Sequence, residues 1–280
     1  MLGPLLAELI RIALAEDVSG GDLTTSALVA PGSRAIGRAL AKSPLVACGS
    51  EVFARVFYEI DPGVRVERKV DDGARVEPGS VLWEVEGSTR TILMGERTAL
   101  NFAQRMSGVA TLTRRFVDAI PAGSHLRIAD TRKTTPGLRA LERYAVRTGG
   151  GSNHRNDLGS AVLIKDNHIE AAGGITPALE SARRFAPHTS RIEIEVESLE
   201  ALDEALAAGA DIVMLDNFAP DALAEAVKRA RGKALCEVSG GVTLDRIPEL
   251  ARAGVDVVSV GALTHSAAAA DISLDIERLS

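Results

Sequence analysis

The second half of the chain alternates short apolar runs with longer amphipathic segments, and this alternation limits the fold more than any other feature. The apolar runs are typical of buried parallel strands, and the segments between them have the apolar spacing of helices. Such alternation favours one parallel sheet, because each helix returns the chain to the same edge. Strands are predicted at residues 126–129, 161–164, 191–196, 212–215, 234–238 and 257–260. Helices are predicted at residues 138–147, 176–185, 199–208, 220–229 and 244–253.

The first half has a different pattern. An amphipathic helix is predicted over residues 5–16, and the glycine-rich stretch that follows it is expected to be a loop. Segments with period-two alternation and Gly or Pro turns then indicate antiparallel strands. A long helical tract follows at 92–120, in which Gly108 is expected to divide two helices. We therefore expect an α+β domain over 1–108 and an α/β domain over 109–266.

Residues 126–168 form a basic island in an acidic protein. The chain has a formal net charge of -6, whereas this stretch holds eight Lys or Arg residues and four Asp or Glu residues. Arg132 and Lys133 follow one predicted strand, and Lys165 and His168 follow the next. The carboxyl ends of parallel strands meet at one edge, where α/β folds bind ligands. The island is therefore a candidate anion site, although any single cation fits a plain surface position as well.

A pair of acids lies at the ends of two later strands. Glu193, Glu195 and Glu197 share one face of the predicted strand 191–196 and its end, and Asp216 ends the strand after it. Three acids on one face do not fit an apolar core, so the face lines a wet cavity or its last acids lie at the edge. A Glu and an Asp at adjacent strand ends suit Mg²⁺, which takes one or two carboxylates plus water and phosphate oxygens. A solvated strand end is the alternative for either acid alone.

Two loops near the C-terminus have the composition of phosphate sites. Ser239, Gly240 and Gly241 directly follow a predicted strand, and Gly261 follows the last one, with His265 four residues later. Small residues leave backbone N–H groups free to bind a phosphate. Two successive loops of this kind occupy the usual phosphate position of α/β barrels.

Three long motifs resemble the quinolinate phosphoribosyltransferase family: TRKTTPGLR, YAVRTGGGSNHR and LIKDNH. The resemblance covers nearly the whole chain. It implies an incomplete, about seven-stranded α/β barrel with an N-terminal α+β sandwich-like domain, to which residues 267–280 return. The implied reaction transfers the phosphoribosyl group of phosphoribosyl pyrophosphate (PRPP) to quinolinate with decarboxylation. Its products are nicotinate mononucleotide, diphosphate and CO₂, a step of de novo NAD biosynthesis.

The resemblance also implies roles for individual residues. Glu195 and Asp216 match the metal and diphosphate site, with Mg²⁺ as the cofactor and Glu193 as the less favoured choice. Lys133 matches the PRPP side, and Arg97 matches an arginine supplied across a homodimer interface. The quinolinate side is implied to comprise Arg97, Arg132, His154, Arg155 and Lys165. The 5′-phosphate side is implied to comprise Ser239, Gly240, Gly241, Gly261 and His265. His168 and Asn167 receive no role.

Three alternative functions remain open from the sequence. Lys165 at a strand end also suits a Schiff-base lyase, in which a neutral lysine is the nucleophile. A related phosphoribosyltransferase for another base and a non-catalytic sensor of phosphate ligands are the others. The acidic chain lacks a basic patch interleaved with aromatic residues, which disfavours nucleic-acid binding. The absence of a long apolar run disfavours a membrane span, and two isolated cysteines, Cys48 and Cys236, indicate reduced thiols in a cytoplasmic protein.

Overall fold

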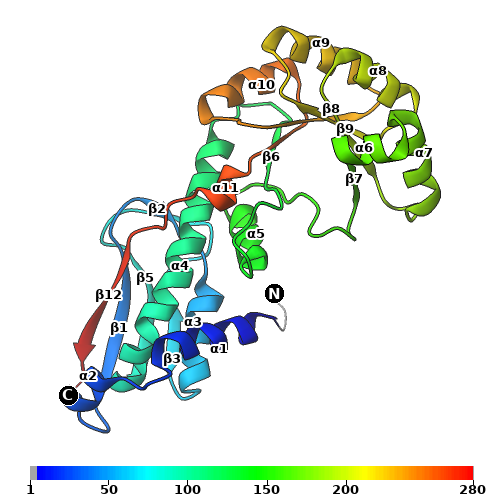
Figure 1. Cartoon of the computed structure of the whole chain (residues 1–280). Coiled ribbons are helices and arrows are strands. Elements are labelled where there is room, and N and C mark those ends of the chain that lie inside the picture. The colour runs from blue at the N-terminus through cyan, green and yellow to red at the C-terminus, as the bar shows by residue number, and fades with distance from the viewer. Residues whose placement is uncertain (1–4, 280) are drawn as a thin grey trace. The chain divides into compact units, whose positions relative to one another are not determined.

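The computed structural model describes residues 5–279, which form two compact units (Figure 1). The first unit comprises the described residues of Met1–Arg114, Thr135–Gly150 and the described residues of Thr264–Ser280. The second unit comprises Arg115–Thr134 and Gly151–Leu263. The chain therefore leaves and re-enters the first unit, and helix α5 (Arg139–Thr148) belongs with the N-terminal elements.

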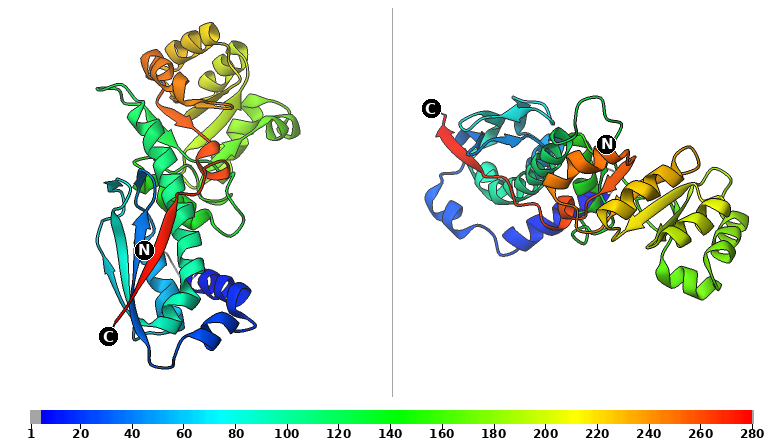
Figure 2. Two further views of the ribbon diagram at one scale, coloured as in Figure 1. Left: turned by 90° about the vertical axis from the view of Figure 1, so that its left-hand side faces the viewer. Right: turned by 90° about the horizontal axis from the view of Figure 1, so that it is seen from above.

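The first unit is built on an antiparallel sheet in the order β12-β1-β5-β3. The C-terminal strand pairs with β1, so the end of the chain lies in the N-terminal sheet, where the resemblance places it (Figure 2). Its core includes Trp83 and Phe53, whose ring centroids lie 5.0 Å apart. The strands are β1 (Arg34–Ala41), β2 (Leu45–Val46), β3 (Arg65–Arg68), β4 (Arg75–Val76), β5 (Val81–Ser88) and β12 (Ile272–Arg278). The helices are α1 (Leu5–Val18), α2 (Leu23–Leu28), α3 (Ser50–Ile60), the N-terminal part of α4 (Thr89–Asp118) and α5.

Two predictions for this unit were wrong. The stretch expected to be a loop contains helix α2, because the Asp22 carboxylate accepts the backbone N–H of Thr25 at 2.8 Å and caps the helix. Gly108 does not divide α4, which is continuous. A Cβ at Gly108 would lie 2.0 Å from the carbonyl oxygen of Ala268. The glycine thus permits close packing of the C-terminal segment, and one helical glycine costs only about 1 kcal/mol.

The second unit is a parallel sheet in the order β6-β11-β10-β9-β8-β7. All six predicted strands are present, and no boundary differs by more than one residue. The backbone of Ser152 adds a one-residue parallel bridge beside Ala129 in β6. The six strands and this bridge agree with an incomplete barrel of about seven strands. The strands are β6 (Arg127–Ala129), β7 (Val162–Ile164), β8 (Ile192–Val196), β9 (Ile212–Asp216), β10 (Leu235–Ser239) and β11 (Val257–Ser259).

Helices alternate with these strands as predicted. The segment 244–253 begins as a 3₁₀ turn and continues as α10, and α6 and α11 were not predicted. The helices are α6 (Asp166–Ala172), α7 (Ile175–Phe185), α8 (Leu199–Ala207), α9 (Pro220–Ala230), the 3₁₀ helix η1 (Leu244–Arg246), α10 (Ile247–Ala253) and α11 (Ala262–His265). Cys48 and Cys236 are free and buried, and burial is the main cause that raises the pKa of Cys236 to about 12. Within residues 5–279, none of the helices has the length and apolar character needed to span a bilayer.

A candidate active site at the carboxyl edge of the parallel sheet

The acids predicted at two strand ends meet in the structure. Glu195 lies near the end of β8 and forms an ion pair with the Lys165 ammonium group. Asp216 ends the neighbouring strand β9. Burial is the main cause that raises the pKa of Asp216, and the Glu195 carboxylate adds to this effect. The ammonium groups of Lys165 and Lys133 act in the opposite direction, so all four side chains share one electrostatic environment.

The glycine-rich loop after β10 lies against the Asp216 carboxylate. Ser239 is the parallel neighbour of Asp216, and Gly240 follows it. Gly240 has a φ of 90°, and a Cβ there would lie 2.8 Å from Asp216 Oδ1. Asn217, with a φ of 55°, donates from its side-chain amide to Asp216 Oδ2 at 2.8 Å. The loop is thus held beside the acid pair, and only glycine fits at 240 without strain.

A second cluster, the His154 cluster, consists of His154, Glu193 and Glu237. His154 Nε2 lies 3.2 Å from Glu193 Oε2 and 3.4 Å from Glu237 Oε1, and both carboxylates are buried. Burial lowers the pKa of His154, but hydrogen bonds to Glu193 and Glu237 outweigh it and raise the pKa to about 10. The Arg155 amide opposes this rise, because it donates to Nδ1 at 2.7 Å and needs a lone pair there. Contacts to two carboxylate groups outweigh one neutral N–H dipole, so the raised direction holds.

The GGGSNHR loop that carries His154 is fixed by a buried aspartate. Asp130 follows β6 and is fully buried. Its Oδ1 accepts the backbone N–H of His154 at 2.7 Å, and its Oδ2 accepts the side-chain amide of Asn153 at 2.5 Å. Asp130 directly follows β6 in the motif LRIAD, so this motif contributes an anchor for the GGGSNHR loop as well as the cations that come after it.

Two arginines of the basic island lie close together. Burial and the nearby positive charge of Arg132 lower the pKa of Arg155. Arg155 donates from Nη1 to the carbonyl oxygen of Ala161 at 3.1 Å, which orients its guanidinium group. Two neighbouring guanidinium groups that are partly withdrawn from water favour an anionic ligand that bears more than one carboxylate.

The other predicted residues have different surroundings. Gly261 follows β11 in the second unit, whereas Arg97 and His265 are exposed residues of the first unit, and their roles rest on the resemblance alone. His168 accepts the backbone N–H of Lys165 through Nδ1 at 2.9 Å. It caps the start of α6, a structural role that the sequence did not indicate. Glu237 was also missed, although a lone Glu in the apolar run ALCEV was a signal for it.

The carboxylates at the edge fit a hard divalent cation. Oxygen atoms of Glu195, Glu197 and Asp216 lie within 4.8 Å of one another. An all-oxygen set at an open edge suits Mg²⁺, which retains water and binds phosphate oxygens. The His154 cluster also brings three donors within 4.8 Å. It does not suit a metal, because with Nδ1 facing the Arg155 amide the ring retains its proton at Nε2, the atom between the carboxylates.

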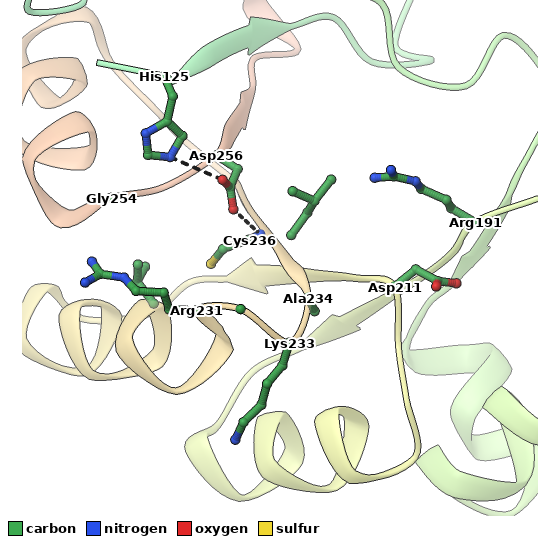
Figure 3. A pocket seen from close by; sticks show the side chains of 12 residues that line it. His125, Arg191, Asp211, Arg231, Lys233, Ala234, Cys236, Gly254 and Asp256 are labelled. Atoms are coloured by element: carbon green, nitrogen blue, oxygen red, sulfur yellow. Dashed lines mark hydrogen bonds and ion pairs between the residues drawn. The ribbon is translucent and has the colours of Figure 1, made fainter. Parts of the chain in front are cut away.

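A separate cavity of about 590 Å³ opens at the opposite edge of the sheet, before β8, β9, β10 and β11 (Figure 3). Its acids have structural roles: Asp211 accepts the N–H of Ile192 at 2.9 Å, and Asp256 accepts the N–H of Cys236 at 2.8 Å. Its cationic side chains extend to different sides in Figure 3 and do not converge. Among the described residues that line this cavity, the charged groups thus do not converge on one ligand position.

Comparisons with known proteins agree on one family. A model of the quinolinate phosphoribosyl transferase N-terminal domain matches residues 22–107, and its C-terminal counterpart matches residues 109–275. The carboxylating nicotinate-nucleotide pyrophosphorylase of Mycobacterium leprae is 45% identical over 273 residues, which cover 95% of each chain. The human protein of that name is 40% identical over 97% of this chain and 91% of its own length. The crystal structure of NadC from Streptococcus pyogenes has a TM-score of 0.95 at 40% identity and covers 100% of this chain and 99% of its own. The chain therefore belongs to the quinolinate phosphoribosyl transferase family.

Proposed function

We propose that the protein transfers the phosphoribosyl group of PRPP to the ring nitrogen of quinolinate, giving nicotinate mononucleotide, diphosphate and CO₂. The names of relatives such as the Mycobacterium leprae enzyme support this reaction. One structural observation carries the proposal: Glu193 and Glu195, two residues apart on β8, belong to two different clusters. Glu193 contacts the His154 ring, and its charge acts on Arg155. Glu195 instead forms an ion pair with Lys165. Strand β8 thus joins a base half of the site to a diphosphate half.

The base half takes quinolinate, which carries two adjacent carboxylates. Arg132 and Arg155 lie close enough to influence each other and suit paired carboxylates, because guanidinium groups bind them through two parallel hydrogen bonds. The His154 ring lies between the buried carboxylates of Glu193 and Glu237. We therefore assign it the role of holding the GGGSNHR loop, and with it Arg155, beside quinolinate. We assign Arg97 to the same half, supplied by the partner in a homodimer.

The diphosphate half takes the leaving group of PRPP. Glu195 and Asp216, with Glu197 at the same edge, would hold Mg²⁺, which when bound supplies positive charge to the departing diphosphate. Lys133 adds a protein cation to that side. The loops at Ser239–Gly241 and after β11 bind the 5′-phosphate through backbone N–H groups.

The chemistry then depends mainly on orientation. The ribose C1–diphosphate bond breaks as the ring nitrogen bonds to C1, through a transition state with oxocarbenium character. Holding both reactants in line supplies roughly 7–11 kcal/mol in favourable cases. The ring-2 carboxylate then leaves as CO₂, its electron pair stays at C2 beside the positive nitrogen, and a proton restores the C–H bond. No covalent enzyme intermediate is needed. The two buried free thiols agree with a reducing compartment, and we assign the enzyme to the cytoplasm.

A Schiff-base mechanism at Lys165 has less support. The Lys165 side chain is engaged by the Glu195 carboxylate, whereas a Schiff-base nucleophile must be free to attack a carbonyl carbon. Trapping with borohydride and a carbonyl substrate tests this alternative directly. Covalent labelling of Lys165 would support the lyase over the transferase.

The test of the proposal is diphosphate release from PRPP with quinolinate or nicotinate as the acceptor. Nicotinate has one carboxylate, so it leaves part of the cationic base half unsatisfied. Each lost charge-assisted contact costs about 1.5–3 kcal/mol, or on the order of 10- to 100-fold in rate. Arg155→Ala should weaken the apparent affinity for quinolinate more than that for PRPP, and Lys133→Ala should do the reverse. Equal use of both acids, or one shared pattern for both variants, would contradict the division of the site.

A further inference from the structure

Helix α5 connects two loops of the candidate site. The segment before it carries Arg132 and Lys133, and the loop after it carries His154 and Arg155. The helix itself belongs to the first unit, whereas these four residues belong to the second. The chain therefore leaves the second unit at residue 134, forms α5 in the first unit and returns to the second unit at residue 151.

The side chain of Glu142 on α5 is fully buried and holds the start of this region. Its Oε1 accepts hydrogen bonds from Arg105 Nε at 3.0 Å and Nη2 at 2.6 Å, which makes a fork between guanidinium and carboxylate. Its Oε2 accepts the backbone N–H of Thr135 at 3.1 Å. Glu142 thus fixes the backbone two residues after Lys133.

Arg105 on α4 connects the same carboxylate to a second segment. Its Nη1 donates to the carbonyl oxygen of Ala267 at 2.8 Å, and its Nη2 also donates to the carbonyl oxygen of Thr264. Thr264 lies three residues after Gly261, the glycine assigned to phosphate binding. Arg105 therefore binds the segment at Thr264 directly and the segment at Thr135 through Glu142.

A buried ion pair of this kind contributes little net stability, because the cost of desolvating both charges offsets their attraction. Replacing such a pair by apolar residues of similar volume is often neutral or stabilising in proteins. What apolar side chains cannot do is bind one amide N–H and two carbonyl oxygens in a fixed geometry. Arginine suits this task because its planar group offers five donors in fixed directions.

We infer that Arg105 and Glu142 are positioning residues for the proposed phosphoribosyl transfer. They hold the segments that carry Lys133 and Gly261, so that the diphosphate and 5′-phosphate contacts keep their places. The inference rests on the proposed function for its kinetic consequences, but the anchoring itself can be measured without activity.

The chain offers a matched control on the same helix. Tyr144 on α5 donates from its hydroxyl group to Asp72 Oδ2 at 2.9 Å. Asp72 also accepts the N–H groups of Gly49 and Ser50 at the start of α3. The Tyr144 contact holds α5 but reaches neither Thr135 nor Thr264. Tyr144→Phe should therefore lower the thermal midpoint without changing kcat/KM by more than about twofold.

Two conservative variants separate the anchored segments. Glu142→Gln retains an acceptor for Arg105 but turns an amide N–H toward the N–H of Thr135. We expect it to lower kcat on the order of 10- to 100-fold, because Lys133 loses its place at the leaving group. Arg105→Lys retains the charge beside Glu142 but cannot reach both carbonyl groups. We expect it to raise the KM for PRPP about tenfold or more while the KM for quinolinate changes less.

Amide hydrogen exchange gives a readout that does not require turnover. Exchange at Thr135 and across residues 262–267 should accelerate in both variants and remain as in the parent chain in Tyr144→Phe. Folded variants that keep kcat/KM within twofold, or a Tyr144→Phe that loses as much activity, would overturn the inference. If the parent chain itself fails to use quinolinate and PRPP, the proposed function fails. The exchange data alone then decide: faster exchange supports the anchor, and unchanged exchange refutes it.

Discussion

The contact between Gly240 and Asp216 gives a prediction that separates backbone strain from damage to the site. We compare Gly240→Ala with Gly241→Ala, two adjacent substitutions in one loop. Both glycines have a positive φ, 90° at Gly240 and 57° at Gly241. A Cβ at Gly241 would meet nothing within 4 Å, whereas a Cβ at Gly240 would lie 2.8 Å from Asp216 Oδ1. The neighbouring variant is therefore a control for the backbone effect.

The magnitudes follow from these two geometries. An L-residue in a left-handed conformation costs about 1–2 kcal/mol, so both variants should lose a few degrees of thermal midpoint. Ordinary van der Waals contact begins near 3.4 Å, so in Gly240→Ala the carboxylate must move by about 0.6 Å or the loop must yield. A misplacement of this size at a charged ligand costs on the order of tenfold in kcat/KM, since a 1 Å error can cost about 100-fold. Gly241→Ala lies in the loop assigned to the 5′-phosphate, so any further loss there should appear in the KM for PRPP and not in the Mg²⁺ requirement.

The assay is diphosphate release from PRPP and quinolinate at several Mg²⁺ concentrations, together with thermal unfolding of each variant. Gly240→Ala should need more Mg²⁺ for half-maximal rate, and Gly241→Ala should not. If both variants lose equal activity at equal loss of stability, strain in the loop explains the effect. The proposed contact between loop and acid pair would then have no catalytic meaning.

Three further predictions concern the charged groups. Glu195→Ala combined with Asp216→Ala should abolish turnover at every Mg²⁺ concentration while circular dichroism stays unchanged; near-normal activity would refute the metal assignment. Arg97→Ala and Lys133→Ala, each with strongly reduced activity alone, should regain part of the activity after subunit exchange if sites are shared, and confirmed exchange without recovery counts against sharing. The raised pKa of His154 adds stability that is present below its unfolded pKa near 6.5 and is lost as pH rises toward about 10. The free energy of unfolding should therefore fall by on the order of 1–3 kcal/mol between pH 7 and 10, and a fall of equal size in His154→Gln would exclude His154 as its source.

The parallel sheet could be predicted from the sequence because its strands are buried and its helices are amphipathic. Runs such as IVML are apolar throughout and are followed by a polar or small residue, so no strand boundary differs by more than one residue. Gly108 in α4 was misinterpreted because propensity treats glycine as a helix breaker. Its close approach to Ala268, 160 residues later in the chain, decides otherwise. Long-range packing of this kind leaves no local pattern in the sequence.

The site was predictable to the level of the strand end and no further. The sequence places Glu195 and Lys165 at one edge but assigns them to different substrates, so neither their ion pair nor the partners of His154 were predicted. The sequence motif assigns His154 to the ligand, and the structure places its ring between two buried carboxylates. The hydrogen bond from Thr135 to Glu142 was also not predicted from the sequence, because an acid in an amphipathic helix usually faces water.

In strand β8, the alternation of side chains predicts which face an acid lies on but not which partners it has. The pattern correctly assigns Glu193 and Glu195 to one face, but depth along that face decides their chemistry. Glu193 lies deeper, where two carboxylates can be tolerated only around a proton, and a histidine supplies it. Glu195 lies one pleat nearer the edge, where a lysine partner and a second acid leave oxygen atoms open to a cation. A shift of one strand repeat, about 6.6 Å along the chain, therefore converts the same residue type from an internal support into a metal-side ligand.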